Sequence, residues 1–176
     1  RYPDEYETYQ IETWVSDVNR LMSTRNFILY DMQGSIIGKA CTNWSMIDFK
    51  TRLPLDLRNI GQYQAAIIPQ DPPIERPAKI TKINGTVTES HLIRYSDIDF
   101  NQHTNSMKYV QWMVDMLPLK KFTDQRLCRL DINFLHETRY GQLVQIVMEN
   151  DDNFDKFEIK LADTGVATCK ASLRWM

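Results

Sequence analysis

The sequence predicts an α+β fold in which an antiparallel sheet wraps around one central helix. Residues 107–117 contain neither Gly nor Pro and carry apolar side chains at helical spacing, which is typical of an amphipathic helix. Short runs of alternating apolar and polar residues follow it, as in antiparallel strands with one buried face. The helix has a second apolar face at Tyr109, Trp112 and Met116, so we expect sheet to surround it.

The first sixty residues are predicted to form strands only. Runs rich in β-branched and aromatic residues indicate strands at 11–15, 25–30 and 35–47, and an extended piece at 53–55 ends the block. Residues 61–85 hold several prolines and little periodicity, which indicates a surface linker. We therefore expect a partial N-terminal domain at 1–60, a linker at 61–85 and a second domain at 86–176.

The second domain is predicted to begin with a strand at 87–95, which leads through a polar stretch into the helix. Further strands are expected at 126–134, 143–148, 157–161 and 166–175. In the strand at 166–175, alternation turns the odd-numbered residues toward the core. In the strand at 126–134, alternation places four residues on a single face: Cys128, Leu130, Ile132 and Phe134.

A repeated sequence pattern indicates that one structural unit occurs twice in the chain. The pattern G-x4-K-A-x3-W occurs at residues 34–44 and again at residues 165–175, each time after a strand and a turn. Self-similarity of this kind is typical of duplication. We expect tandem hot-dog folds, each an antiparallel sheet around a helix, with the first copy incomplete at its N-terminus. By the length of the second copy, roughly fifty residues or more, including a helix, are expected to precede Arg1.

Composition argues against several kinds of protein. A hydrophobic content of 43% and a charged content of 25% are typical of a globular protein. The formal net charge of -2 argues against a nucleic-acid-binding domain, and no apolar run approaches the roughly 18 residues that span a membrane. The cysteines at 41, 128 and 169 fit neither a disulfide framework nor a zinc pattern, which favours a reducing, cytoplasm-like compartment.

The polar stretch before the helix is the first candidate site. Hydrogen-bonding side chains recur at Asp97, Asp99, Asn101 and His103, and they share one side if the segment is extended. Thr104 or Asn105 can already cap the helix. Three more polar groups exceed what capping requires, so we predict a reaction site at Asp99, Asn101 and His103.

Metal binding is the alternative for this stretch, and the spacing argues against it. A calcium loop that began at Asp97 would need Gly and Glu where Gln102 and Lys108 stand. A zinc site would need further His or Cys ligands nearby, but His91 and His136 stand alone. We therefore expect no metal and no cofactor.

Glu137 is a second candidate, at the end of a predicted strand. A lone carboxylate in such a place is more commonly a solvated group. Strict alternation from Cys128 would put His136, and not Glu137, on the helix side. Glu137 can meet His103 only through a bulge or on the outer side of the sheet.

The stretch 99–109 resembles the motif D-x-N-x-H-V-N-N-x-K-Y of the acyl-acyl carrier protein thioesterases, with Thr104 and Ser106 as the two departures. These are double hot-dog enzymes that release fatty acids during fatty acid synthesis. Their catalytic Glu lies 34 residues beyond the His, as Glu137 lies beyond His103. The resemblance implies that the catalytic residues are Asp99, Asn101, His103 and Glu137.

The resemblance also implies a mechanism. Plant members carry Cys after this Glu, where the sequence has Thr138, so we expect hydrolysis by activated water rather than by a thiolate. Glu137 would act on the water while Asn101 and His103 position it, and either Glu137 or His103 could take the proton. Amides near Thr104 and Asn105 would polarise the carbonyl as an oxyanion develops.

The implied partner is an acyl carrier protein that bears a phosphopantetheine-linked acyl chain. The implied setting is a bacterial cytoplasm, with a mature plastid enzyme as the other option, and a homodimer stays open. Two alternatives are a hot-dog acyl-CoA thioesterase and a non-catalytic acyl-binding or assembly module. A local basic excess is either a solvated face or a dock for an acidic partner. It consists of Lys108, Lys120, Lys121, Arg126, Arg129 and Arg139.

Overall fold

The computed structural model describes residues 3–48, 50–51, 53–151 and 153–176. Arg1, on which the prediction of missing N-terminal residues rests, lies outside them. The chain forms two units, Arg1–Pro77 and Ala78–Met176, and each is described by itself. Within the described residues, no helix has the length and apolar character that crossing a membrane requires.

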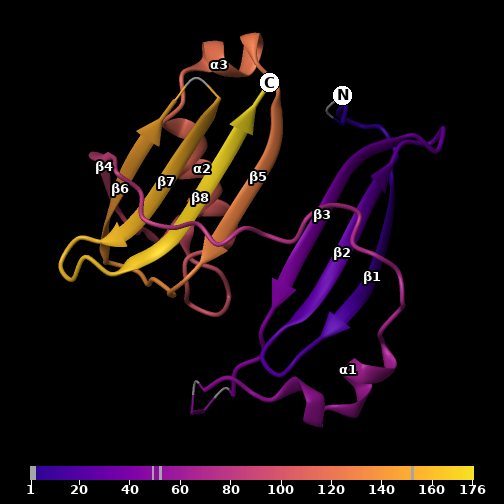
Figure 1. The fold of residues 1–176 in the computed structure, drawn as a ribbon. Helices are drawn as coiled ribbons and strands as arrows, with labels where there is room; N and C mark the ends of the chain where they lie inside the picture. The colour runs from indigo at the N-terminus through magenta and orange to yellow at the C-terminus, as the bar shows by residue number, and fades with distance from the viewer. Residues whose placement is uncertain (1–2, 49, 52, 152) are drawn as a thin grey trace. The chain divides into compact units, whose positions relative to one another are not determined.

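Unit 1 is built on a three-stranded antiparallel sheet in the order β1-β2-β3 (Figure 1). The strands are β1 (Gln10–Val18), β2 (Ser23–Tyr30) and β3 (Ile36–Trp44), so the three main predicted strands are present with shifted ends. Residues 57–59, which were expected among strands only, form the short 3-10 helix η1 (Leu57–Asn59). Helix α1 (Gly61–Ala65) follows, inside the stretch predicted as a linker.

The segment after α1 is attached to the sheet of unit 1. The Ile68 amide donates to the Val15 carbonyl at 2.9 Å, and Trp14 Nε1 donates to the Gln70 carbonyl at 3.1 Å. Trp14 and Val15 are buried. Residues 67–70 are therefore held by β1, and the boundary between the units falls later among the prolines, after Pro77.

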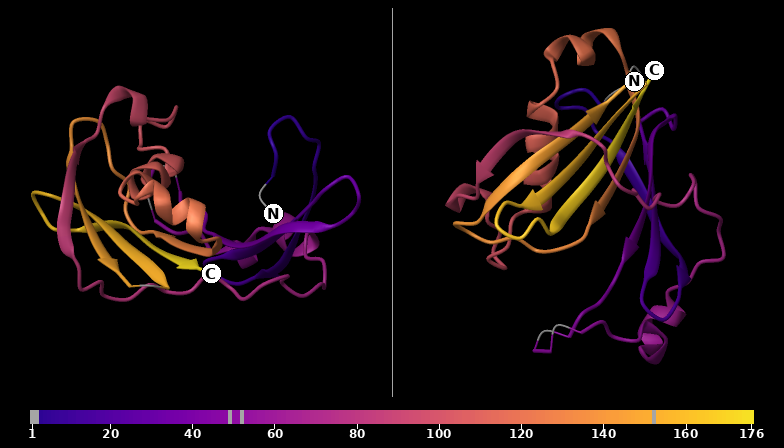
Figure 2. Two further views of the ribbon diagram at one scale, coloured as in Figure 1. Left: turned by 90° about the horizontal axis from the view of Figure 1, so that it is seen from above. Right: turned by 60° about the vertical axis from the view of Figure 1, so that its left-hand side comes forward.

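Unit 2 has the predicted hot-dog architecture. Five antiparallel strands in the order β4-β6-β7-β8-β5 curve around helix α2 (Ser106–Asp115), as Figures 1 and 2 show. The strands are β4 (Thr86–Leu92), β5 (Leu127–Phe134), β6 (Leu143–Asn150), β7 (Phe154–Leu161) and β8 (Ala167–Trp175). The α+β class with an antiparallel sheet and a central helix is confirmed.

The core of unit 2 lies between α2 and the concave face of the sheet. Helical spacing brings Tyr109, Trp112 and Met113 to the sheet side, where they join Phe157 and the buried odd-numbered residues 169–175 of β8. Each fully buried apolar side chain of this size contributes about 1.5–3 kcal/mol relative to its exposed state. This packing fixes α2 on the sheet and so fixes the loop that enters it.

Strand β5 departs from the predicted alternation at its start. A register shift between Leu127 and Arg129 leaves Cys128 exposed, while Leu127 packs against the core. The prediction that Cys128 shares one face of the strand with Leu130, Ile132 and Phe134 was therefore wrong for Cys128. Farther along, Ile132 packs on the core and the Phe134 ring centroid lies 6.0 Å from that of Tyr109.

Two short helices in unit 2 were not predicted. The strand expected to reach residue 95 ends at Leu92, and the 3-10 helix η2 (Tyr95–Asp97) follows. Helix α3 (Leu119–Asp124) begins after Pro118, which the sequence indicated only as a helix end. Lys121 Nζ lies 2.7 Å from Oδ2 of the fully buried Asp155, and this ion pair fastens α3 to the sheet.

The two copies of the repeated pattern have the same local structure, a turn followed by a strand, although β3 is an edge strand and β8 an inner strand. Gly34 (φ 80°) and Gly165 (φ 70°) adopt the left-handed conformation that glycine favours, in the turns before β3 and β8. Both strands then end at the tryptophan of the pattern, Trp44 and Trp175.

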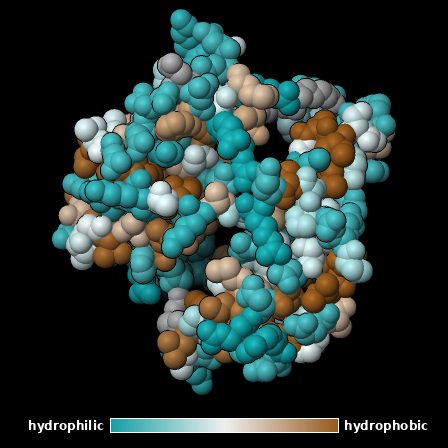
Figure 3. Space-filling model, viewed as in Figure 1, coloured by the Kyte–Doolittle hydropathy of each residue, from teal (hydrophilic) through white to brown (hydrophobic). Residues whose placement is uncertain are grey.

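Residues 78–84 cross the face of the sheet that is opposite α2 (Figures 1 and 2). Asn133 Oδ1 accepts a hydrogen bond from the Ile80 amide at 2.9 Å, and Lys170 Nζ donates to the Thr81 carbonyl at 3.2 Å. Hydrophilic side chains occupy much of this face of unit 2 (Figure 3). The polar stretch before α2 therefore approaches the sheet from its other side.

Candidate active site

The polar stretch before α2 folds into a tight loop. Ile98 and Thr104 pair as an isolated antiparallel bridge, and the Asp99 amide donates to the His103 carbonyl at 2.8 Å. Gln102 turns the chain with a positive φ of 64°. The prediction of an extended segment with four side chains on one side was therefore wrong.

Asp99 shapes this loop from within. Its Oδ1 accepts hydrogen bonds from the Asn101 amide at 2.8 Å and from the His103 amide at 3.3 Å. Such side-chain bonds to the following backbone favour a turn over a strand. Asp99 thereby fixes the backbone of two predicted site residues, and Asn101 lies exposed on the loop.

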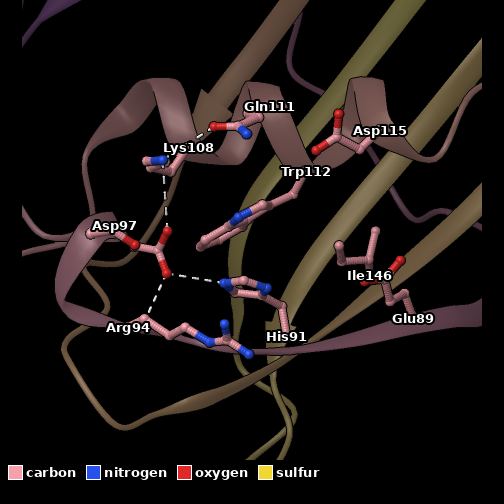
Figure 4. A pocket seen from close by; sticks show the side chains of 10 residues that line it. Glu89, His91, Arg94, Asp97, Lys108, Gln111, Trp112, Asp115 and Ile146 are labelled. Atoms are coloured by element: carbon pink, nitrogen blue, oxygen red, sulfur yellow. Dashed lines mark hydrogen bonds and ion pairs between the residues drawn. The ribbon is translucent and has the colours of Figure 1, made fainter.

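Asp97 belongs to a different network, between β4 and α2. Figure 4 shows its carboxylate bonded to His91 Nε2 at 3.0 Å and to the Arg94 amide at 2.8 Å, with Lys108 Nζ at 3.9 Å. Burial opposes ionisation of Asp97, but the bonds from Arg94 and His91 and the charge of Lys108 hold its pKa below the ordinary 3.8. The network lines a polar cavity of about 280 Å³ beside Trp112. Asp97 is thus a structural anchor.

His103 and Glu137 lie together, although 34 positions separate them. His103 Nε2 is 3.2 Å from Glu137 Oε2. The amides of Leu135 and His136 both donate to the Thr168 carbonyl, so two residues of one chain segment face one residue of β8. This bulge-like irregularity ends the alternation of β5 and brings Glu137, rather than the exposed His136, toward the loop.

Thr104 and Asn105, the two residues directly before α2, already make hydrogen bonds within the protein. Asn105 caps the helix, because its Oδ1 accepts from the Met107 amide at 2.9 Å. The Thr104 amide donates to the Thr138 carbonyl at 2.9 Å, and the Asn105 amide donates to the Asp97 carbonyl at 2.8 Å. These two amides, predicted as oxyanion donors, already donate within the protein.

Cysteine chemistry has no support near this pair. The place after Glu137 holds Thr138, whose side chain is fully buried and bonded to Thr104 and Tyr109. Burial raises the pKa of Cys169 to about 12, so its thiol stays protonated at neutral pH. Cys41 is buried in unit 1, and the exposed Cys128 lies at the start of β5. No metal-binding group of three or more His, Cys, Asp or Glu occurs among the described residues.

Sequence reasoning missed the hydroxyl groups behind the pair. Thr104, Thr138 and Tyr109 form a buried cluster that touches both chain segments. The available signal was that a threonine directly follows each of His103 and Glu137.

Models of two protein families match the chain. The acyl-ACP thioesterase N-terminal domain matches residues 1–59, and the acyl-ACP thioesterase C-terminal domain matches residues 81–176. The second match contains the whole loop, α2 and Glu137.

Among curated proteins, the acyl-[acyl-carrier-protein] hydrolase FATB3 of Cuphea viscosissima is 28% identical over 160 residues, or 86% of this chain and 38% of that protein. The palmitoyl-acyl carrier protein thioesterase of Gossypium hirsutum is 26% identical over 196 residues, or 99% of this chain and 47% of that protein. Both relatives are described as chloroplastic. The chain therefore spans less than half the length of these relatives.

Among solved structures, an acyl-ACP thioesterase from Bacteroides thetaiotaomicron matches with a TM-score of 0.89 and 28% identity, over 97% of this chain and 70% of that one. The 12:0-ACP thioesterase of Umbellularia californica matches with a TM-score of 0.84 and 21% identity, over 100% of this chain and 70% of that one. The second likeness concerns the fold alone.

Proposed function

The chain belongs to the acyl-ACP thioesterase family, and from this premise we propose that it hydrolyses fatty acyl thioesters of acyl carrier protein during fatty acid biosynthesis. The observation that carries the proposal is the 3.2 Å approach of His103 Nε2 to Glu137 Oε2, in the half of the chain that the C-terminal domain model matches. Activation of water requires a general base, and a second side chain in hydrogen-bond contact with that base holds it in position.

In the proposed reaction, Glu137 takes a proton from water as the water oxygen attacks the thioester carbonyl. The Glu137 side chain is 44% exposed and that of His103 is 19% exposed, so the carboxylate is the more accessible of the two. His103, the less exposed of the two side chains, contacts the Glu137 carboxylate and orients it. The tetrahedral intermediate then collapses, the C–S bond breaks, and Glu137 gives the proton that it took from water to the leaving thiolate, so that the thiol and the fatty acid are released.

The remaining predicted site residues receive supporting roles. Asn101, exposed on the loop, positions the water or the carbonyl. Asp99 holds the loop through its two amide bonds. Thr104 and Asn105 fix the start of α2, because both of their amides are already bonded within the protein. The partial positive charge at this helix start still favours an oxyanion nearby.

The proposed partner is an acyl carrier protein with a phosphopantetheine-linked acyl chain. Three of the predicted basic residues already form ion pairs within the protein, so the basic surface available to the carrier protein is smaller than the sequence indicated. The pairs are Lys108 with Asp97, Lys121 with Asp155 and Arg129 with Asp131. Arg126 and Arg139 are exposed and remain for an acidic partner. We place the reaction in a bacterial cytoplasm or a plastid, and a homodimer stays open.

The proposal is tested by steady-state hydrolysis of one acyl chain carried on acyl carrier protein and on coenzyme A. The proposed function predicts fatty acid release from both, with the higher kcat/KM on acyl carrier protein. A higher kcat/KM on coenzyme A would assign the acyl-CoA thioesterase alternative. Binding of the acyl thioester without release of fatty acid would assign the non-catalytic module.

A further inference from the structure

We propose that the buried hydroxyl of Thr138, together with those of Thr104 and Tyr109, positions Glu137 against His103. These three residues act through the pair and do not touch the reacting atoms. The inference rests on the proposed function for its kinetic consequences, while its structural part can be tested separately.

The first step of the argument is the backbone. Thr104 directly follows His103, and Thr138 directly follows Glu137. The Thr104 amide donates to the Thr138 carbonyl at 2.9 Å, so the chain is tied at the residue next to each member of the pair. A shift of one segment along the other would therefore move His103 and Glu137 apart.

The second step is the contact between the hydroxyl groups. Thr104 Oγ1 donates to the Thr138 carbonyl at 3.4 Å and also lies 2.7 Å from Thr138 Oγ1. Tyr109 Oη lies 2.7 Å from Thr138 Oγ1. Within each of the two hydroxyl pairs, either oxygen can be the donor. The three hydroxyls form one chain that runs from α2 through Thr138 to the loop.

The third step is burial. Thr138 has an exposed fraction of 0%, and Thr104 and Tyr109 are buried as well. Water therefore has little access to replace a lost bond, and a buried polar group without a partner is costly. Burial also raises the pKa of Tyr109, which keeps the phenol protonated and able to hydrogen-bond with Thr138.

The fourth step is the rigidity of Tyr109. The Tyr109 ring lies in edge contact with Trp112 of α2, at 5.4 Å between centroids, and with Phe134 at the end of β5, at 6.0 Å. Tyr109 is thus fixed by the core, and the hydroxyl chain transmits its position to the segment that carries Glu137. A displacement of about 1 Å at a reacting group can lower a rate by about 100-fold, so this positioning matters for catalysis.

The test compares Thr138→Val, which keeps the shape and removes the hydroxyl, with Thr138→Ser, which keeps the hydroxyl. Thr138→Val is expected to lower kcat by about 10- to 100-fold with KM changed by less than about twofold, and Thr138→Ser to stay within about threefold of wild type. Tyr109→Phe, which removes only the hydroxyl at the α2 end of the chain, is also expected to lower kcat. Equal activity of the Val and Ser variants would overturn the proposal.

A double-variant cycle separates positioning from general damage to the fold. In a Glu137→Gln background the pair no longer contains the carboxylate, so adding Thr138→Val is expected to lower the residual rate by less than about twofold. The same 10- to 100-fold loss in both backgrounds would show that Thr138 does not act through Glu137.

A chemical-modification experiment tests the positioning of His103 even if the protein does not hydrolyse acyl-ACP. Diethyl pyrocarbonate modifies histidine side chains, and mass spectrometry resolves the three histidines of the chain. Thr138→Val is expected to raise the modification rate of His103 several-fold, while the exposed His136 keeps its rate and serves as the internal control. An unchanged His103 rate would overturn the positioning claim whether or not the protein hydrolyses acyl-ACP. A wild-type protein that releases no fatty acid would overturn only the proposed function.

Discussion

His103 and Glu137 meet at 3.2 Å although neither residue lies in a helix or a strand. The loop before α2 supplies His103, and the irregular segment after β5 supplies Glu137. Both segments are anchored to the core of unit 2, through α2 on one side and through the Thr168 carbonyl on the other. The pair is therefore held by the hot-dog fold itself.

Cysteine alkylation tests the absence of a thiol nucleophile. Iodoacetamide applied to the folded protein is expected to modify Cys128, because Cys41 and Cys169 are buried and the Cys169 thiol stays protonated. Mass spectrometry reports the modified residue, and the rate of fatty acid release is expected to stay unchanged. Loss of activity in proportion to alkylation would contradict hydrolysis by activated water.

Substitutions of Asp99 test whether it acts by accepting hydrogen bonds from the loop amides or through its negative charge. Asp99→Asn keeps an oxygen that can accept from the Asn101 and His103 amides, whereas Asp99→Ala removes it. We expect Asp99→Ala to lower kcat by about 10- to 100-fold and Asp99→Asn to lower it much less. Equal losses in the two variants, measured by steady-state kinetics, would show that the negative charge of Asp99 matters more than its acceptor.

Asp97 couples the stability of unit 2 to pH. Its pKa lies below 3.8 in the folded state, so its contribution to stability is present above the unfolded pKa and is lost as pH falls through the folded pKa. Asp97→Asn is expected to lower the free energy of unfolding by about 1–3 kcal/mol at pH 7, because it weakens the bonds to His91, Arg94 and Lys108. The difference from wild type is expected to shrink below about pH 4.

Urea unfolding at a series of pH values measures this difference. Asp115→Asn is the matched control, since Asp115 is an exposed carboxylate at the same cavity and is expected to leave stability nearly unchanged. A wild-type advantage that persists unchanged to pH 3 would contradict the assigned role of Asp97.

The sequence predicted the parts of this protein that depend on local periodicity. Helical spacing located α2, and alternation located β8 with its buried odd-numbered residues. It did not predict the fold of residues 97–103, because the Asp99 side-chain bonds and the positive φ of Gln102 override a polar alternation that resembles a strand. Helix α3 was missed because Pro118 was interpreted only as a helix end, whereas proline is also well suited to precede a helix.

The candidate site was predictable in its residue types but not in its geometry. The motif and its spacing predicted Asp99, Asn101, His103 and Glu137 as candidates, but the contact between His103 and Glu137 depends on pairings between distant segments. The two amides that share the Thr168 carbonyl form such a pairing, and the bond from Thr104 to Thr138 is another. Neither leaves a periodic signal in the sequence, because both lie where regular alternation has ended.

Glu137→Gln provides the most direct measurement of the central claim. The substitution keeps the size of the side chain and removes the base, so kcat for hydrolysis of acyl-ACP is expected to fall by about 100-fold or more while thermal stability stays close to wild type. The neighbouring exposed His136→Gln is the control and is expected to keep wild-type turnover. Near-wild-type turnover of Glu137→Gln, in an assay where wild type and His136→Gln are both active, would contradict the account.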